Sequence, residues 1–231
     1  MDYTLRGQTH KIAGILNGVH YDKKKFDLKE KAPLKAKIQK LFGLEENPHR
    51  PLIAMVTRLV HQKGLDLVDF AKFDLMNLPA DFVFLGTGST NYENMLIWSS
   101  NNSSNMRAWI DFKADLSEEL YKASDFFLMP SLFEPCGISQ MIASRYGAIP
   151  IVRETGGLKD SIKDFGCEGG GNGYTFANYN TNDFIYSINR ALKDFEDKTS
   201  WAEKIKICMN KDFSWNVSAK EYANLYADLL K

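Results

Sequence analysis

Two cationic side chains, Arg58 and Lys63, lie five positions apart in the sequence TRLVHQKG at residues 57–64. The apolar run at residues 52–56 precedes them, and a helical pattern of apolar residues begins at Leu65. The first turn of a helix has unpaired backbone N–H groups and already attracts negative charge, so cations there add nothing to helix stability. They are explained if the loop holds an anion such as a diphosphate. Spacing alone leaves one alternative open, that both are solvated surface cations.

A carboxylate, Glu134, lies in the sequence PSLFEPCGIS at residues 130–139, between an apolar run and the start of a helical pattern. The backbone N–H groups of Gly137 and Ile138, together with the hydroxyl of Ser139, would open that helix and face an anion. A carboxylate beside such a site repels a bare phosphate but can bind the hydroxyl groups of a ligand. We therefore expect a ligand that carries both phosphate and hydroxyl groups. The alternative is that Glu134 is a solvated loop residue.

Three further loops follow apolar runs. The sequences GTGS at residues 86–89 and TGGL at residues 155–158 contain glycines, which would let the backbone approach a ligand closely. Ordinary turns between strands and helices also use glycine, and Asn91 replaces the third glycine of a dinucleotide fingerprint. Phe112 follows another run and could stack on a flat ring, although such an aromatic residue more commonly packs in the core.

These loops require a scaffold of strands and helices. Short apolar runs without polar alternation predict strands that are buried on both faces, at residues 52–56, 81–85, 106–110, 126–129 and 148–152. Helical patterns separate them, so the chain is predicted to form an α/β fold with a Rossmann-like open parallel sheet and right-handed crossovers. Ligands of such sheets bind outside the carboxyl ends of the strands, where all these loops lie. Helices are expected in the tail at residues 183–195, 200–209 and 217–230.

The first fifty residues differ from the rest. Residues 23–40 contain eight lysines, which indicates a solvated connecting helix, with a polyanion site as the alternative. The apolar run at residues 12–19 ends in an Asn-Gly turn and has no partner strand nearby in the sequence. We therefore expect residues 1–50 to form a connection and a linker helix, and residues 51–231 to form the domain. The Asn/Ser cluster at residues 99–105 predicts an exposed loop.

Composition excludes several classes of protein. The chain has 231 residues, of which 44% are hydrophobic and 25% charged, as in ordinary soluble domains with a sizeable core. Its 29 Lys+Arg balance 29 Asp+Glu, which argues against a nucleic-acid-binding protein. No apolar run reaches the roughly 18 residues of a membrane span, and the first residues lack the apolar region of a signal peptide. The 3 Cys lack paired spacing, and the 4 His lack metal-ligand spacing.

Six of these motifs, in this order, resemble the C-terminal half of bacterial glycogen synthases and plant starch synthases: residues 57–64, 85–88, 133–138, 145–147, 155–158 and 212–215. Residues 15–18 resemble the stretch by which that family's chain enters this half, so the resemblance covers essentially the whole chain. It implies the GT-B architecture, in which two Rossmann-like domains face a deep cleft, with the N-terminal domain absent from this sequence. It also implies retaining transfer of glucose from ADP-glucose to the non-reducing end of an α-1,4-glucan.

The resemblance also implies roles for individual residues. Arg58 and Lys63 match the diphosphate ligands, and Glu134 matches the carboxylate that contacts the hydroxyls of the donor glucose; these three are the expected catalytic residues. The expected nucleotide-sugar-binding residues are Gly86, Gly88, Phe112, Cys136, Gly137, Ile138, Ser139, Thr155 and Gly156. Three of them depart mildly from the family: Phe112 replaces a frequent Tyr, and Ile138 and Ser139 replace the common Leu and Thr.

Partners follow from the same resemblance: ADP-glucose or ADP, an α-1,4-glucan acceptor and the N-terminal domain of the same enzyme, with no nucleic acid and no membrane. No metal or other cofactor is expected, and the location would be the cytoplasm, or the plastid for a plant or algal source. The domain alone is expected to be inactive, because transfer requires donor and acceptor held together in a closed cleft. Two alternatives remain open: a GT-B glycosyltransferase domain for a different sugar nucleotide, and a non-catalytic nucleotide- or glucan-binding module.

Overall fold

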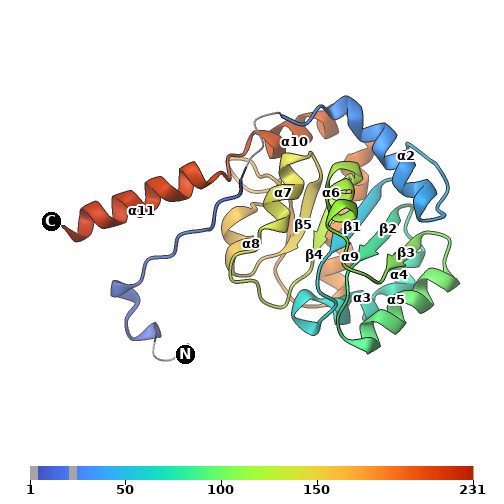
Figure 1. Ribbon diagram of the computed structural model, residues 1–231, viewed down its shortest axis with the longest axis horizontal. Helices are drawn as coiled ribbons and strands as arrows, with labels where there is room; N and C mark the ends of the chain where they lie inside the picture. The colour runs from blue at the N-terminus through green and yellow to red at the C-terminus, as the bar shows by residue number, and fades with distance from the viewer. Residues whose placement is uncertain (1–4, 21–24, 231) are drawn as a thin grey trace.

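A computed structural model describes residues 5–20 and 25–230 (Figure 1). The expectation about a signal peptide concerns residues 1–4, and two of the eight lysines are Lys23 and Lys24; all of these lie outside the described residues. One parallel sheet forms the centre of the described part and confirms the predicted α/β class. Its strands are β1 Leu52–Val56, β2 Asp81–Leu85, β3 Met106–Trp109, β4 Phe126–Met129, β5 Ile149–Arg153 and β6 Tyr174–Phe176.

The strand order in the sheet is β3-β2-β1-β4-β5-β6. The chain therefore winds outward from β1 to β3 and then crosses back, so that β4 pairs with the free side of β1, with Ile53 opposite Phe126. Loops that follow β1 and β4 leave the sheet in opposite directions at this reversal. A crevice at the carboxyl ends of the strands is the expected consequence of such a reversal.

Helices cover both faces of the sheet. The α-helices are α2 Lys31–Leu41, α3 Leu65–Phe70, α4 Lys72–Met76, α5 Thr90–Asn102, α6 Ala114–Ala123, α7 Ser139–Arg145, α8 Gly156–Ser161, α9 Thr181–Glu196, α10 Lys198–Asn210 and α11 Trp215–Leu229. Short 3-10 turns occur at η1 Thr9–Lys11, η2 Leu28–Glu30 and η3 His61–Lys63. The core on one face involves α2, α6, α7 and α8, and the core on the other involves α3, α4, α5, α9 and α10. No helix in the described ranges is long and apolar enough to cross a membrane.

The apolar runs form strands because both of their faces are buried. In β1, Ile53 and Met55 belong to one core cluster, whereas Leu52 and Ala54 belong to the other. Each fully buried aliphatic side chain of this size stabilises the fold by about 1.5–3 kcal/mol. The sequence-based strands agree with β1, β2 and β4, and differ by one residue at the ends of β3 and β5. β6 was missed because three residues are too few to show a period.

The run at residues 12–19 has no partner strand nearby in the sequence, and in the structure it forms no strand. Val19 makes a single parallel bridge with Ser214, so the partner of this run comes from the far end of the sequence. The prediction of an exposed loop at residues 99–105 was wrong in part: α5 continues to Asn102, and Ser99 and Asn105 are fully buried, although Asn101, Asn102 and Ser104 are exposed. The amide of Asn105 donates to the carbonyls of Leu75 and Ala80, at 3.0 and 2.9 Å, which explains why a polar residue is buried there.

The lysine-rich helix α2 was predicted to be solvated, and this prediction was wrong in part. Lys31 and Lys35 are buried, and Lys35 forms an ion pair with Asp125 at 2.7 Å. The ammonium of Lys31 donates to the carbonyls of Lys122 and Tyr146, at 3.1 and 3.2 Å, near the C-terminal ends of α6 and α7. Carbonyls at helix ends need such donors. The domain boundary at residue 50 stays a prediction, although α2 packs as part of the described unit.

Burial lowers the pKa of Lys31 from 10.5 to about 8, because desolvation disfavours the ammonium. Unfolding therefore takes up a proton between pH 8 and 10.5, and stability conferred by the wild-type side chain rises with pH across that window. We predict that the free energy of unfolding of wild type relative to Lys31→Met increases by on the order of 3 kcal/mol across it. Urea denaturation at a series of pH values measures this difference. Lys37→Met, which removes an exposed lysine of the same helix, is the control, and an equal pH dependence in both variants would contradict the prediction.

Candidate functional site

The loops after β1 and β4 meet at the carboxyl edge of the sheet, where the N–H of Leu132 donates to the carbonyl of Gln62. Lys63 ends the short turn η3 after β1, and Glu134 follows β4. Their side chains form an ion pair between Nζ and Oε2 in which the side chains are only 17% and 9% exposed. The hydroxyl of Ser131 lies 3.4 Å from the same carboxylate oxygen. Two of the three residues expected to be catalytic, 71 positions apart in the sequence, are thus in direct contact.

Backbone contacts join these two loops into one unit. The N–H of Leu132 donates to the carbonyl of Gln62 at 2.9 Å, and the side-chain amide of Gln62 donates to the carbonyl of Phe133 at 3.2 Å. The turn that carries Lys63 ends at Gly64, whose φ of 81° is a left-handed conformation that glycine adopts without strain. The positions of Lys63 and Glu134 are therefore coupled through the backbone as well as through their charges.

The glycine pair after β5 packs against the Glu134 loop. The N–H of Gly157 donates to the carbonyl of Glu134 at 2.9 Å. A Cβ atom on Gly156 would lie 2.2 Å from that carbonyl oxygen, and one on Gly157 would lie 2.1 Å from the carbonyl oxygen of Cys136. The close approach predicted from these glycines is thus an approach to a neighbouring loop. Whether Gly156 and the half-buried Thr155 also contact a ligand stays a prediction.

The Gly-Thr-Gly loop after β2 behaves in the same way. A Cβ atom on Gly86 would lie 1.8 Å from the carbonyl oxygen of Thr57, and one on Gly88 would lie 2.2 Å from that of Leu59. The N–H of Leu59 also donates to the carbonyl of Thr87 at 2.8 Å. These glycines let the loop after β2 support the loop that carries Arg58 and Lys63.

Free backbone donors occur where α7 begins. Within the described residues, the N–H groups of Gly137, Ile138 and Ser139 have no hydrogen-bond partner. The buried amide of Gln140 donates to the carbonyls of Cys136 and Gly137, at 3.3 and 3.1 Å, and so holds these carbonyls on the protein side. The hydroxyl of Ser139 accepts a hydrogen bond from Tyr121, at 3.1 Å. This segment can therefore present N–H donors to an anion.

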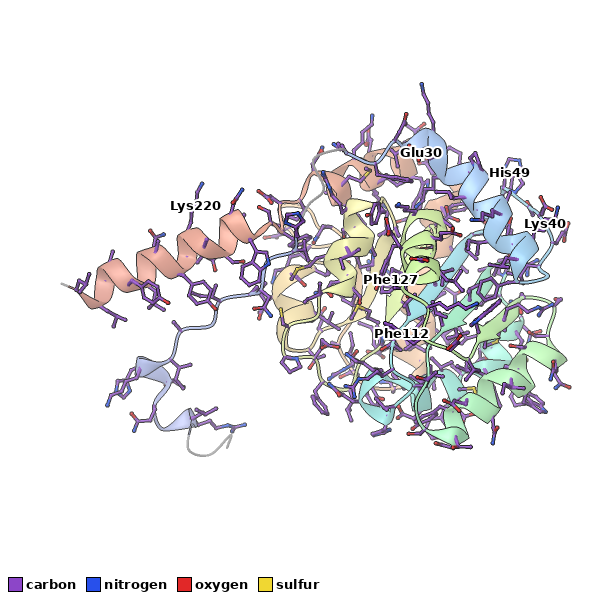
Figure 2. The ribbon with its side chains drawn as sticks, in the orientation of Figure 1. Glu30, Lys40, His49, Phe112, Phe127 and Lys220 are labelled. Atoms are coloured by element: carbon purple, nitrogen blue, oxygen red, sulfur yellow. The ribbon has the colours of Figure 1, made fainter. Side chains whose placement is uncertain are left out.

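A cavity of about 480 Å³ opens at the carboxyl ends of β1 and β2. Apolar and aromatic side chains such as Phe112, Tyr121 and Ile142 line it, together with Arg58. Phe112 is 82% exposed, so it is not a core residue, whereas Phe127, which is also labelled in Figure 2, is fully buried. Burial raises the pKa of Tyr121, which keeps its hydroxyl neutral. The cavity can accommodate a flat ring beside a cation.

The cations of the site differ in their partners. Lys63 is paired with Glu134, whereas the exposed side chain of Arg58 makes no hydrogen bond or ion pair with any residue in the described ranges. Two residues that the sequence analysis missed support the site: Arg153, which ends β5 and donates to the Glu134 loop, and Gln140. A cation at the carboxyl end of the fifth apolar run was the available signal for Arg153. The described residues contain no group of three His, Cys, Asp or Glu side chains that could hold a metal.

Comparison with known proteins gives consistent matches. The family model described as "Glycosyl transferases group 1" matches residues 12–207. A glycogen synthase from Clostridioides difficile is 43% identical over 99% of this chain and 51% of its own length. One from Bacillus cereus is 41% identical over the full chain and 52% of its own length. The chain thus spans about half the length of the curated relatives it matches.

Solved structures agree with this comparison. The catalytic domain of Starch Synthase IV from Arabidopsis thaliana, bound to ADP and acarbose, superposes with a TM-score of 0.87 at 36% identity, over 98% of this chain and 50% of that one. Sucrose-phosphate synthase from Thermosynechococcus elongatus superposes with a TM-score of 0.68 at 18% identity, over 99% of this chain and 56% of that one. The second likeness shows the fold alone.

The Lys63–Glu134 pair predicts an unusual effect on anion binding. An anion at Lys63 must compete with the Glu134 carboxylate, so Glu134→Gln should strengthen binding of inorganic pyrophosphate. Removing one charge a few ångströms from the anion changes the interaction by about 1–3 kcal/mol at the effective dielectric of a partly buried site. We therefore expect an affinity about tenfold higher, measured by titration calorimetry. Glu203→Gln, which changes the net charge equally on the exposed side of α10, is the control, and weaker binding by Glu134→Gln would contradict this account.

Proposed function

The chain belongs to the group 1 glycosyl transferases, and we propose that it is the nucleotide-sugar-binding half of an ADP-glucose-dependent glucan synthase. One observation carries the proposal: a cation and a carboxylate from different loops meet at the crevice, where a diphosphate and a sugar need opposite charges. The ring-sized cavity is lined by Arg58, which belongs to the same loop as Lys63. The glycogen synthases with 41–43% identity and the starch synthase bound to ADP and acarbose support the same assignment.

In the proposed reaction, breaking the glucose–phosphate bond leaves negative charge on the departing diphosphate. Lys63 and Arg58 neutralise that charge, and the N–H groups where α7 begins donate to the phosphate oxygens. A charge-assisted hydrogen bond contributes about 1.5–3 kcal/mol, so two of them give roughly 3–6 kcal/mol. Made only in the transition state, this would accelerate transfer by about 10² to 10⁴. Part of it is used to bind the diphosphate in the ground state, so the gain in rate is smaller.

Glu134 binds the sugar part of the ADP-glucose donor. Its carboxylate accepts hydrogen bonds from the hydroxyls of glucose, and its contact with Lys63 places it next to the cation that receives the diphosphate. Adenine occupies the cavity near Phe112, with Arg58 close to the phosphates. The α-1,4-glucan acceptor is held by a second domain, since this chain supplies one side of the cleft and spans about half the length of its relatives.

ADP binding tests the proposed function directly. We predict that the chain binds ADP by titration calorimetry with the same affinity in EDTA as in Mg²⁺, because side-chain cations and N–H groups neutralise the diphosphate. UDP and GDP should bind more weakly than ADP if the cavity near Phe112 recognises the adenine base. A strict Mg²⁺ requirement would refute the metal-free account, and a preference for UDP or GDP would favour a transferase for another sugar nucleotide.

Replacement of the lysine separates phosphate recognition from base recognition. We predict that Lys63→Ala weakens ADP binding at least tenfold and leaves adenosine binding almost unchanged, because the phosphates are the only part of the ligand that the ammonium is proposed to bind. The same calorimetric titration measures both ligands, and Lys206→Ala on the exposed side of α10 serves as the matched charge control. Equal losses for ADP and adenosine would mean that the substitution had disturbed the fold of the site.

A further inference from the structure

The guanidinium of Arg153 donates all of its hydrogen bonds in the described structure to backbone carbonyls. Arg153 is the last residue of β5, and its Nε donates to the carbonyl of Ser131 at 2.8 Å. Its Nη2 donates to the carbonyl of Leu132, and its Nη1 lies 3.4 Å from the carbonyl oxygen of Ala177. Among the described residues, no carboxylate forms an ion pair with it. The only aromatic contact places its guanidinium 5.4 Å from the ring centroid of Tyr179 in the described structure.

A half-buried guanidinium without a carboxylate partner is costly, and desolvation lowers the pKa of Arg153. The bonds that offset this cost are directed at two adjacent peptide groups, those of Ser131 and Leu132. Arginine suits such a role because its planar fork can donate to two acceptors in a fixed geometry. The two carbonyls belong to the residues three and two positions before Glu134.

Residues 131 and 132, whose carbonyls Arg153 binds, also make contacts with the Glu134 carboxylate and with the loop that carries Lys63. The Ser131 hydroxyl lies 3.4 Å from the carboxylate oxygen that pairs with Lys63. Both peptide groups of Leu132 are hydrogen-bonded: its carbonyl accepts a hydrogen bond from Arg153, and its N–H donates one to the carbonyl of Gln62, the residue before Lys63. A displacement of this segment would therefore move the carboxylate relative to the ammonium.

We propose that Arg153 is a positioning residue that fixes the backbone of Ser131 and Leu132 and thereby holds the Glu134 carboxylate where it discriminates sugar nucleotide from free nucleotide. The inference rests on the proposed function. A correctly placed carboxylate accepts hydrogen bonds from the glucose hydroxyls of ADP-glucose and repels the terminal phosphate of ADP. Arg153 therefore acts on the ratio of the Kd for ADP to the Kd for ADP-glucose, and not on recognition of the nucleoside.

The test measures that ratio by titration calorimetry, with adenosine binding and Tm recorded for each variant. We expect Arg153→Met to lower the ratio about fivefold to tenfold, close to the value for Glu134→Gln, with adenosine affinity unchanged. Arg153→Lys should recover part of the ratio, because one ammonium can hold one carbonyl. The Arg153→Met/Glu134→Gln double variant should show no further change, since both substitutions remove the same interaction.

A matched control is available in Arg107, another half-buried arginine whose guanidinium donates to backbone carbonyls, including that of Ser103 at 2.9 Å. Arg107→Met should lower Tm and leave the ratio unchanged. If Arg153→Met behaves like Arg107→Met, then Arg153 is merely structural and the proposal is overturned; an additive double variant overturns it as well. If Arg153→Met does not fold, the same criteria apply to Arg153→Lys. If the wild-type chain binds ADP but the Arg153 variants leave the ratio unchanged, only the role of Arg153 is refuted. If the wild-type chain binds neither ADP nor ADP-glucose, the proposed function is refuted.

Discussion

The pairing of β4 with the free side of β1 is the constraint on which the site depends. β1 has five residues and β4 has four, and both strands are buried on both faces. Once Ile53 lies opposite Phe126, the register of this pair has little freedom to shift. The loops that follow these strands then diverge at the same edge of the sheet and enclose the crevice. Lys63 belongs to one loop and Glu134 to the other, so their contact is a consequence of strand order.

The ion pair itself is better understood as a positioning device than as a source of stability. Taking an ammonium and a carboxylate out of water costs much of what their attraction returns, so such pairs contribute little net stability. Removing one partner, however, leaves the other charge unmatched in a poorly hydrated place. The Lys63–Glu134 pair by itself therefore carries no net charge. In the proposed function, the diphosphate and the sugar hydroxyls of one ligand replace the two partners together.

The loops at the carboxyl edge support one another through their backbones. The loop after β2 packs under the loop after β1 at Gly86, and the turn into α8 packs on the Glu134 loop at Gly156. Arg153 adds side-chain bonds at the same place. Side chains on such interlocked loops have few alternative positions, which is the condition that preorganised electrostatic stabilisation requires. The glycines are explained by this close packing before any ligand is considered.

Local sequence determined the parallel α/β class, because fully buried strands must be apolar on both faces, and it identified the loops that carry Arg58, Lys63 and Glu134. It could not reveal β6, whose three residues show no period, or the burial of Lys31 and Lys35, whose partners are carbonyls and a carboxylate from distant segments. Nor could it predict that Ser99 and Asn105 are buried. Only the tertiary structure decided that β4 lies beside β1 and that Arg153 faces the Glu134 loop. Strand order depends on how helices pack over both faces of the sheet, and no stretch of sequence encodes that locally.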